Sequence, residues 1–485
     1  MMYQTHVFNK NDVLTHGDMN NIIAGIDELK LANPELTASK IYVSTINGND
    51  NNDGSSWTKA KKTFANALAN VSDDCIVFFE GDTNERLNIL TKSTQKSLKV
   101  IGRENTRNRL LGGQKIASFT ADSTANVYYT KLSTNNSNLS QARFRIYQHD
   151  LNDTTTLISD EEKHPAQKGR LYRCTSTKLT KVNSISEVRS SSTFCYYFDT
   201  STLTLYIRTT TKPSETNPIY IPTDEGSIYG NNGSCYVEFS NIETWYAPFL
   251  ITNCPVARVI DCASHYALGT GCLRYDNSVS VQLVRFEANS TQNISGYGDG
   301  INGHSTQLDS NLGINILKPL RYSIELVDCW SHDNMDDGWS DHTGAVSVVR
   351  GGLYEYNTKG GITPSGGARN SCYHVLSRKN YRGFYYICST TTSKETTAWW
   401  YCQDCISMNN SVAGFDTESN GSSLPIHALL NKCQSVNDNV AYRIGKYSYV
   451  KTIDCSQYGA ATILQKDSAA LKHTNIQTTS LESDV

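Results

Sequence analysis

Apolar residues and cysteines recur through the second half of the chain at a nearly regular interval, each after a short strand-like stretch. They occur at Ile242, Cys262, Phe286, Cys329, Gly352, Val375, Cys405, Cys433 and Cys455. Successive spacings are 20, 24, 43, 23, 23, 30, 28 and 22 residues. Steps of 20 to 24 residues fit one coil of a three-sided β-helix. The longer steps fit a coil plus a loop, and the step of 43 is long enough for two coils. This period predicts a parallel β-solenoid over residues 226–466.

The remaining segments predict accessory elements. Residues 1–38 hold a helix with apolar positions Ile22, Ile23, Ile26 and Leu29 at helical spacing. Residues 39–114 begin with a strand, a polar turn and a short helix, followed by the first coils. Residues 115–225 break the pattern, and the stretch 194–208 reads as a hairpin, so we expect an inserted antiparallel β-region. Residues 467–485 form a polar tail.

Composition and charge narrow the function classes. A net charge of −3 without a basic stripe argues against nucleic-acid binding. No apolar stretch reaches about 18 residues, so we expect no membrane insertion. The N-terminus lacks the pattern of a signal peptide. The 14 cysteines are irregularly spaced, and several share the repeat position, so we expect buried free thiols in place of disulfides.

Two short stretches echo each other within the repeat. GDGINGH begins at residue 298 and DDGWSDH at residue 336, and both read Asp-Gly-apolar-polar-x-His. KGGI from residue 359 and YRGF from residue 381 continue the series. If these stretches occupy equivalent positions on successive coils, their charged side chains converge on one patch of the wall. The residues concerned are Asp299, Asp336, Asp337, Lys359 and Arg382.

Carboxylates stacked one coil apart cannot all stay ionised without compensation. One solution is a Ca²⁺ ion bound by Asp299, Asp336 and Asp337. Another is a shared proton, which gives the unequal carboxyl pair that glycosidases use. A third interpretation is structural: Asp and Asn are common in β-helix turns because they bond their own backbone and tolerate left-handed conformations, so turn chemistry alone would account for the Asp-Gly steps.

Two stretches near the N-terminus resemble known families. The sequence DVLT, followed closely by DMNNI, resembles the N-terminal segment of phage tail and baseplate proteins, which attaches the protein to the virion. The stretch from Ile41 to Trp57, with a helix after it, resembles the opening of right-handed parallel β-helix proteins, among them polysaccharide lyases and tailspikes. The resemblance implies a right-handed parallel β-helix whose open end is covered by the short helix.

The stretch SHDNMDDGW from residue 331 resembles the Asn-x-Asp-Asp-Gly-apolar signature of the ninth family of pectate lyases. There, paired aspartates and an Asp one coil earlier bind calcium, which implies these roles for Asp336, Asp337 and Asp299. A lysine on a later coil is the base, and repeat alignment gives Lys359 that position. The family's fourth aspartate falls on Ser340, and Asp341 is one residue away and faces the other side.

Other residues complete the candidate site. Arg382 is in a position to depress the pKa of Lys359 by like charge and to grip a carboxylate. His304 and His342, at matched positions, are alternative proton carriers. The candidate sugar-binding aromatics are Trp339, Trp399, Trp400 and Tyr381. A hydrolase would use Asp299 with Asp336 or Asp337 as acid and base, and carboxylates one coil apart favour a retaining mechanism.

The sequence therefore predicts a phage tailspike-like protein that binds and depolymerises a bacterial surface polysaccharide, as a β-eliminative lyase or a glycoside hydrolase. We expect it in the virion tail, attached through residues 1–38, and as a homotrimer by resemblance. The alternatives are a secreted, extracellular pectate-lyase-like enzyme and a non-catalytic receptor-binding or structural tail protein.

Overall fold

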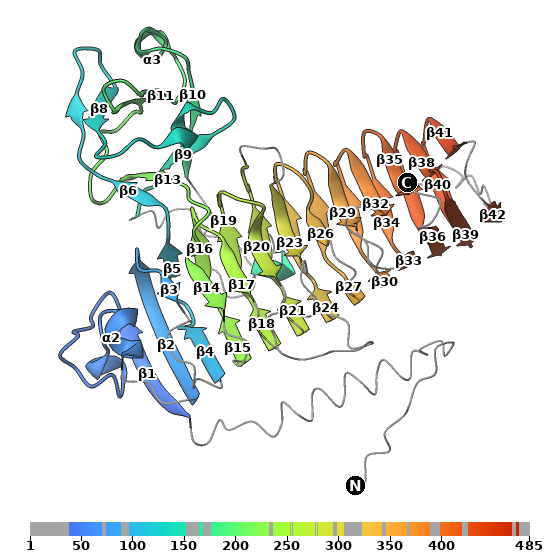
Figure 1. Cartoon of the computed structure of the whole chain (residues 1–485), viewed down its shortest axis with the longest axis horizontal. Helices are drawn as coiled ribbons and strands as arrows, with labels where there is room; N and C mark the ends of the chain where they lie inside the picture. Colours follow the sequence, from blue (N-terminus) through green and yellow to red (C-terminus); the bar gives the residue numbers. More distant parts are fainter. Residues whose placement is uncertain are drawn as a thin grey trace.

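The chain forms an elongated solenoid of stacked coils with a separate β-region beside its N-terminal end (Figure 1). The computed structural model describes residues 38–69, 74–88, 97–151, 164–167, 176–231, 236–252, 254, 256–276, 278, 280–293, 298–304, 323–341, 346–365, 369–388, 398–419, 425–467 and 472–474. Neighbouring strands of the solenoid pair in parallel throughout. The prediction of a parallel β-helix is confirmed.

Three ladders of strands run along the solenoid. The first contains β1 (Ser39–Ser44), β2 (Asp74–Thr83), β4 (Ser97–Gly102), β15 (Tyr236–Ser240), β18 (Val256–Ile260), β21 (Ser280–Val284), β24 (Ser323–Val327), β27 (Val346–Arg350), β30 (Arg369–Tyr373), β33 (Ala398–Gln403), β36 (Ile426–Asn431), β39 (Ser448–Ile453) and β42 (Lys472–Thr474). The second contains β5 (Asn108–Leu111), β16 (Glu243–Trp245), β19 (Ala263–His265), β22 (Glu287–Asn289), β25 (Trp330–His332), β28 (Leu353–Glu355), β31 (Leu376–Arg378), β34 (Ile406–Met408), β37 (Gln434–Val436) and β40 (Ser456–Tyr458). The third contains β3 (Leu87–Asn88), β14 (Ile228–Asn231), β17 (Phe249–Thr252), β20 (Gly271–Asp276), β23 (Asp299–His304), β26 (Trp339–Asp341), β29 (Gly360–Pro364), β32 (Arg382–Cys388), β35 (Ala413–Ser419), β38 (Val440–Ile444) and β41 (Thr462–Lys466).

The short helix α2 (Phe64–Leu68) covers the first coil, as the sequence predicts. Thr63 caps it by accepting a hydrogen bond from the backbone N–H of Asn66. The ring of Phe64 lies 4.8 Å from that of Phe79 in β2, which closes the core at this end. A second short helix, η2 (Trp57–Lys59), precedes it. The helix predicted over residues 22–29 lies outside the described residues.

The inserted β-region lies between β5 and β14, within a single coil. Its strands are β6 (Gln114–Ile116), β7 (Thr120–Ala121), β8 (Val127–Lys131), β9 (Arg145–Gln148), β10 (Thr177–Lys181), β11 (Cys195–Asp199), β12 (Thr204–Arg208) and β13 (Ile219–Ile221). They form one sheet in which all pairs are antiparallel except β10 with β11. The predicted hairpin is β11 with β12. The region also contains the helices η4 (Ser137–Ser140), η5 (Pro165–Gln167) and α3 (Ile185–Ser190).

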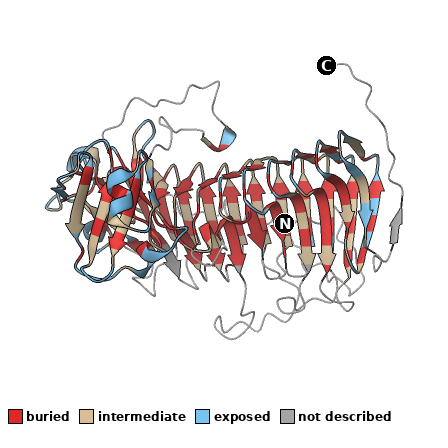
Figure 2. Ribbon diagram, turned by 90° about the horizontal axis from the view of Figure 1, so that it is seen from above, coloured by how far each residue is buried: buried red, intermediate tan, exposed pale blue. Residues whose placement is uncertain are grey.

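Buried residues line the solenoid from one end to the other (Figure 2), and its buried hydrophobic residues form one cluster that extends from Val43 to Cys455. Strands of the first ladder bury alternate residues, because side chains of a strand point to opposite faces. The cysteines whose side chains the structure describes are free and buried, which confirms the prediction of free thiols for these residues. The residue before each predicted repeat position has positive φ, as at Asn241, Asp261 and Asp328, and turns the chain into the second ladder.

The 43-residue interval is one coil with a longer connection, because β21 pairs directly with β24. No helix of the described residues is long and apolar enough to cross a membrane.

Candidate active site

The strand register of the third ladder brings the echoed stretches together. Ile301 pairs with Trp339, Trp339 with Ile362, and Ile362 with Phe384. Two residues before each of these apolar positions stand Asp299, Asp337, Gly360 and Arg382, which therefore occupy the same place on successive coils. The predicted alignment of the four stretches is confirmed.

The glycines of the Asp-Gly steps are required by packing inside the corner. A Cβ added at Gly300 would lie 1.9 Å from Ser331 Oγ. One added at Gly338 would lie 2.8 Å from Nδ2 of Asn357. Asn334 Nδ2 donates to Asn357 Oδ1 at 2.9 Å, and Asn357 Nδ2 donates to the next asparagine of the ladder, Asn380, at 3.1 Å. The structural interpretation of the motif therefore accounts for its glycines.

The aspartates of the motif form a buried cluster. Asp299, Asp336 and Asp337 are 3%, 4% and 7% exposed, and one carboxylate oxygen from each lies within 4.8 Å of the others. The Oδ1 atom of Asp299 accepts from the backbone N–H of Asp337 at 3.1 Å, and Oδ1 of Asp337 accepts from Gly360 at 2.6 Å. Asn302 Nδ2 donates to Oδ2 of Asp299. Asp299 and Asp337 thus each bind the backbone of the next coil and are held against their neighbours.

Burial and mutual repulsion raise the pKa of two of these carboxyl groups. Burial, followed by the charge of Asp336, raises the pKa of Asp299 to about 8. Burial and the charges of Asp299 and Asp336 raise the pKa of Asp337 well above its ordinary value. Both shifts favour the protonated form of Asp299 and Asp337.

Lys359 supplies the compensating positive charge. Its Nζ lies 2.7 Å from Oδ1 and 3.0 Å from Oδ2 of Asp336, and its side chain is half exposed. Burial alone lowers the pKa of Lys359, but the hydrogen bond and charge of Asp336 outweigh it, and the pKa is raised. The expectation of a depressed pKa is wrong, because Lys359 faces three carboxyl groups.

Arg382 does not contact these carboxylates. Its Nε lies 2.8 Å from Oδ2 of Asp416, a carboxylate that the sequence did not single out. Its guanidinium lies over the ring of Tyr385, with 4.1 Å between the guanidinium carbon and the ring centroid, and 5.1 Å from that of Tyr381. Arg382 therefore lies along the same ladder but has its own anionic partner.

The predicted aromatic contacts divide into two groups. Trp339 and Trp400 belong to the buried core, so their prediction as sugar-binding residues is wrong. Trp339 occupies the inward ladder position of Ile301 and Ile362, and its Nε1 donates to Tyr275 Oη at 3.0 Å. Tyr381, 45% exposed, lies one coil beyond Lys359. Trp399 is 49% exposed but belongs to the first ladder, where it stacks on His427.

The two predicted histidines stay untested. The side chain of His304, in β23, and the whole of His342 lie outside the described residues. Asp341 shares the inward face of Trp339, because alternate residues of a strand point the same way, so it does not replace the fourth aspartate at Ser340.

Asp299, Asp336 and Asp337 are the residues that would hold a cation. A calcium ion takes six to eight oxygen ligands. Here Asp299 and Asp337 each use an oxygen on a backbone N–H, and Asp336 holds the Lys359 ammonium. The arrangement fits a shared proton better than a calcium ion.

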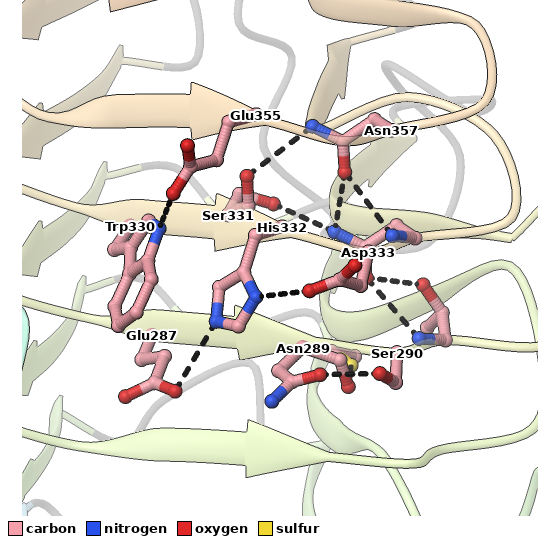
Figure 3. A network of polar contacts seen from close by, with 12 residues as sticks. Glu287, Asn289, Ser290, Trp330, Ser331, His332, Asp333, Glu355 and Asn357 are labelled. Carbon is pink, nitrogen blue, oxygen red and sulfur yellow. Dashed lines mark hydrogen bonds and ion pairs between the residues drawn. The ribbon is translucent and has the colours of Figure 1, made fainter. Parts of the chain in front are cut away.

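A second polar network, which the sequence did not reveal, lies on the outer face of the second ladder (Figure 3). His332 Nδ1 lies 2.7 Å from Oδ2 of Asp333, and Nε2 lies 3.3 Å from Oε1 of Glu287. Burial opposes protonation, but these carboxylates raise the pKa of His332 to about 9. Trp330 stacks on His332 at 4.0 Å between centroids and donates to Glu355. The sequence signal that could have revealed this network is the alignment of outward positions on successive three-residue strands of the second ladder.

No family model and no curated protein matches the sequence. Similar solved structures include one described as a glycoside hydrolase, with a TM-score of 0.46 and 9% identity, covering 88% of this chain and 96% of the other. XylC in complex with xylose has a TM-score of 0.44 and 11% identity, covering 88% and 70%. The pectate lyase Pel9A has a TM-score of 0.40 and 10% identity, covering 91% and 80%. Identities this low transfer no residue roles to this chain.

Proposed function

We propose that the protein is an enzyme that cleaves glycosidic bonds of a polysaccharide at Asp299, Asp336 and Asp337. The observation that carries the proposal is the cluster itself: three buried carboxyl groups within 4.8 Å on stacked coils, two of them with raised pKa. Glycosidases need one protonated and one ionised carboxyl group beside the scissile bond. A purely structural turn has no need of a third carboxylate and a lysine.

The proposed roles follow from the contacts. Asp337, the most exposed of the three, gives its proton to the leaving oxygen. Asp336, paired with the Lys359 ammonium, attacks the anomeric carbon or stabilises the sugar cation. Water, which gives its proton back to Asp337, then adds to the anomeric carbon and releases the sugar. Asn302 and the backbone N–H of Asp337 hold Asp299 in place as a second acid. The close approach of the carboxyl groups favours retention of configuration at the anomeric carbon.

Hydrolysis is better supported than β-elimination. A lyase needs a base that is neutral near the working pH. The raised pKa of Lys359 keeps its ammonium protonated, so it is a poor base. Calcium-assisted elimination at the same carboxylates stays the second candidate, because the donor set fits a cation in part.

The assay incubates the purified full chain with bacterial capsular and uronate-containing polysaccharides, with calcium and with a chelator. Reducing ends report any cleavage, and ultraviolet absorbance reports the conjugated double bond that only a lyase produces. We expect new reducing ends without absorbance, unaffected by the chelator. Absorbance that the chelator abolishes would favour the lyase instead.

Asp337→Asn tests the site directly. We expect a loss of cleavage of about 100-fold or more, since general acid catalysis contributes on this scale. The matched control is Asp404→Asn, which changes a carboxylate at a corner of positive φ that Asn also tolerates. Glycan binding without cleavage in the unmodified protein would instead support a non-catalytic receptor-binding protein.

We also propose that the polymer is a bacterial surface polysaccharide and that the protein is a phage tail component, located in the virion and homotrimeric. Support comes from the resemblance of residues 1–38 to tail and baseplate segments and of the following stretch to tailspikes. Light scattering of the purified chain measures the oligomeric state. A chain lacking residues 1–38 is expected to keep cleavage activity and to lose attachment to tails.

A further inference from the structure

A cavity of about 730 Å³ lies toward the C-terminal end of the third ladder. Its charged lining residues are Arg382, Glu418, Arg443, Lys446, Lys466 and Asp467. Four are cations and two are acids, so the lining is positive although the whole chain carries a net charge of −3. Such a concave basic surface attracts anionic groups.

A buried carboxylate fixes the two arginines of this cavity. The side chain of Asp416 is fully buried, with Oδ2 at 2.8 Å from Arg382 Nε and Oδ1 at 2.7 Å from Arg443 Nε. The ring of Tyr385 supports the Arg382 guanidinium, and Tyr385 Oη donates to Glu418 Oε2 at 3.0 Å. Arginines held in this way lose little conformational freedom when they bind a ligand.

The same residues also have a purely structural explanation. An Arg-Asp-Arg bridge can simply join neighbouring coils, and a buried ion pair is weak evidence of stabilisation or of function. That explanation accounts for Asp416, for both Nε atoms and for Nη2 of Arg443, which lies 3.3 Å from Oε2 of Glu418. It gives no reason for two lysines, Lys446 and Lys466, to line a hollow beside the arginines. The cavity together with the lysines favours a ligand.

The cavity continues the outer face that carries the carboxylate cluster. Gly360, which occupies the position of Asp337, pairs with Arg382, and Asp416 pairs with Arg443. Because successive coils lie about 4.8 Å apart, Arg382 is about 10 Å and Arg443 about 19 Å from Asp337 along the axis. A polymer lying along the ladder would reach both places at once.

We propose that the Arg382–Arg443 cavity is a subsite for an acidic substituent of the polysaccharide, so that the substrate is an anionic glycan. Guanidinium groups bind carboxylate, phosphate and sulfate through paired hydrogen bonds, and each of these groups occurs on acidic glycans. The assignment of the ligand to a cleaved polymer rests on the proposed function. Anion binding by the cavity does not.

Direct binding tests the subsite without any cleavage. Titration of the full chain with glucuronate, followed by NMR or calorimetry, is compared with titration by glucose, its neutral counterpart. Inorganic phosphate and sulfate are titrated in parallel to identify the preferred oxyanion. We expect glucuronate or one of the inorganic anions to bind and glucose not to bind. Equal binding of glucose and the anions, or no binding of any anion, would overturn the proposal.

Arg443→Gln is expected to weaken anion binding about tenfold or more, the effect of losing a charge-assisted hydrogen bond. Lys446→Gln with Lys466→Gln is the second variant, because these lysines have no part in the Asp416 bridge. Lys451→Gln, an exposed lysine of β39, is the control for general charge. Thermal unfolding checks that each variant folds.

Cleavage then separates the two proposals. In an active protein, Arg443→Gln should raise KM for an acidic polymer about tenfold while kcat changes little. If the unmodified protein cleaves no polysaccharide but the variants lose anion binding, the proposed function is wrong and the subsite is supported. Unchanged anion binding in both variants, or an equal loss of anion binding in Lys451→Gln, would contradict the subsite, with or without cleavage activity.

Discussion

At the residue scale, one geometry explains both the order and the chemistry of the cluster. The Oδ1 atoms of Asp299 and Asp337 each accept the backbone N–H of the next coil, which fixes the carboxyl groups in the ladder. The same contacts bury them beside Asp336, and burial with like charge raises their pKa. The structural role of these aspartates and their proposed acid role are therefore two results of one arrangement.

The pH dependence of cleavage follows from these groups. If Asp299 must be protonated, activity should fall as pH rises through about 8. Asp336→Asn removes a neighbouring negative charge and should lower the pKa of Asp299, whereas Lys359→Met removes a positive charge and should raise it. Because Asp336→Asn also removes the proposed nucleophile, NMR titration of the Asp299 carboxyl group measures the pKa in both variants. A rate profile across pH checks the shift in Lys359→Met, where the decline should move to higher pH.

The opposite signs are the internal control. Both variants alter the same ion pair, so a general loss of structure would change the Asp299 pKa in the same direction in both. Two pKa values that shift in the same direction, or do not shift, would contradict the proposed effect of Asp336 and Lys359 on Asp299.

The raised pKa of Asp299 should also make folding stability depend on pH. The Asp299 pKa is raised from 3.8 to about 8, so the native state binds its proton more tightly than the unfolded chain. This contribution is fully present below about pH 4 and is lost as pH rises through about 8. In Asp299→Asn, this part of the decline should disappear. Urea unfolding at several pH values measures it, and an unchanged pH dependence would contradict the raised pKa.

At the element scale, the corners explain which predictions from sequence succeeded. A residue with φ between 50° and 63° precedes every predicted repeat position, for example Asp328 before Cys329 and Asp404 before Cys405. The turn and the buried residue after it leave a regular trace in the sequence. This regularity allowed the coils to be aligned from the sequence, and the alignment predicted that Asp299, Asp336, Asp337 and Lys359 lie close together.

Spacing alone does not report which way a side chain points or what its partner is. Trp399 and Trp400 are neighbours on β33, yet one is half exposed and the other is core, since adjacent strand residues face opposite sides. Arg382 meets Asp416 from a later coil, a pairing that needs the three-dimensional register. Whether the pKa of Lys359 is raised or lowered likewise depends on its distances to neighbouring charges, which a sequence motif does not give.

The glycine ladder yields a test at this scale. A Cβ at Gly361 would lie 2.0 Å from Ser377 Oγ and 2.8 Å from Asn380 Nδ2, both part of the inner polar ladder. Gly361→Ala should therefore reduce the free energy of unfolding by about 1–3 kcal/mol, the usual effect of overpacking. Denaturant unfolding measures the change.

The chain supplies a matched control for this substitution. Ala441 occupies the equivalent place one coil after Gly414, as the pairing of Ala413 with Val440 shows. Ala441→Gly should reduce the free energy of unfolding by about 1–2 kcal/mol, because it adds backbone freedom and removes the methyl group of a fully buried residue. An unchanged free energy of unfolding in Gly361→Ala, beside this loss in Ala441→Gly, would mean that the ladder tolerates a side chain at this corner.

At the scale of the whole molecule, the stacking of coils places the carboxylate cluster and the basic cavity along one ladder. The third ladder runs without a break from the coil of Asp337 to that of Arg443, through pairs that include Ile362 with Phe384 and Phe415 with Tyr442. The inserted β-region lies beside the N-terminal coils, away from the C-terminal cavity (Figure 1). An extended polymer suits a surface of this shape.

Chain length should therefore govern catalytic efficiency. An acidic oligosaccharide too short to span the four coil-to-coil steps from Asp337 to Arg443, about 19 Å, can occupy only one of the two places. We expect kcat/KM to rise with length until both are filled and then to level off, because the added binding energy comes from the cavity. Kinetics on a size-fractionated series of oligosaccharides measures the rise. Arg443→Gln should flatten it, whereas Lys451→Gln should leave it intact. A kcat/KM that is independent of length in the unmodified protein would show that cleavage and anion binding do not share one substrate chain.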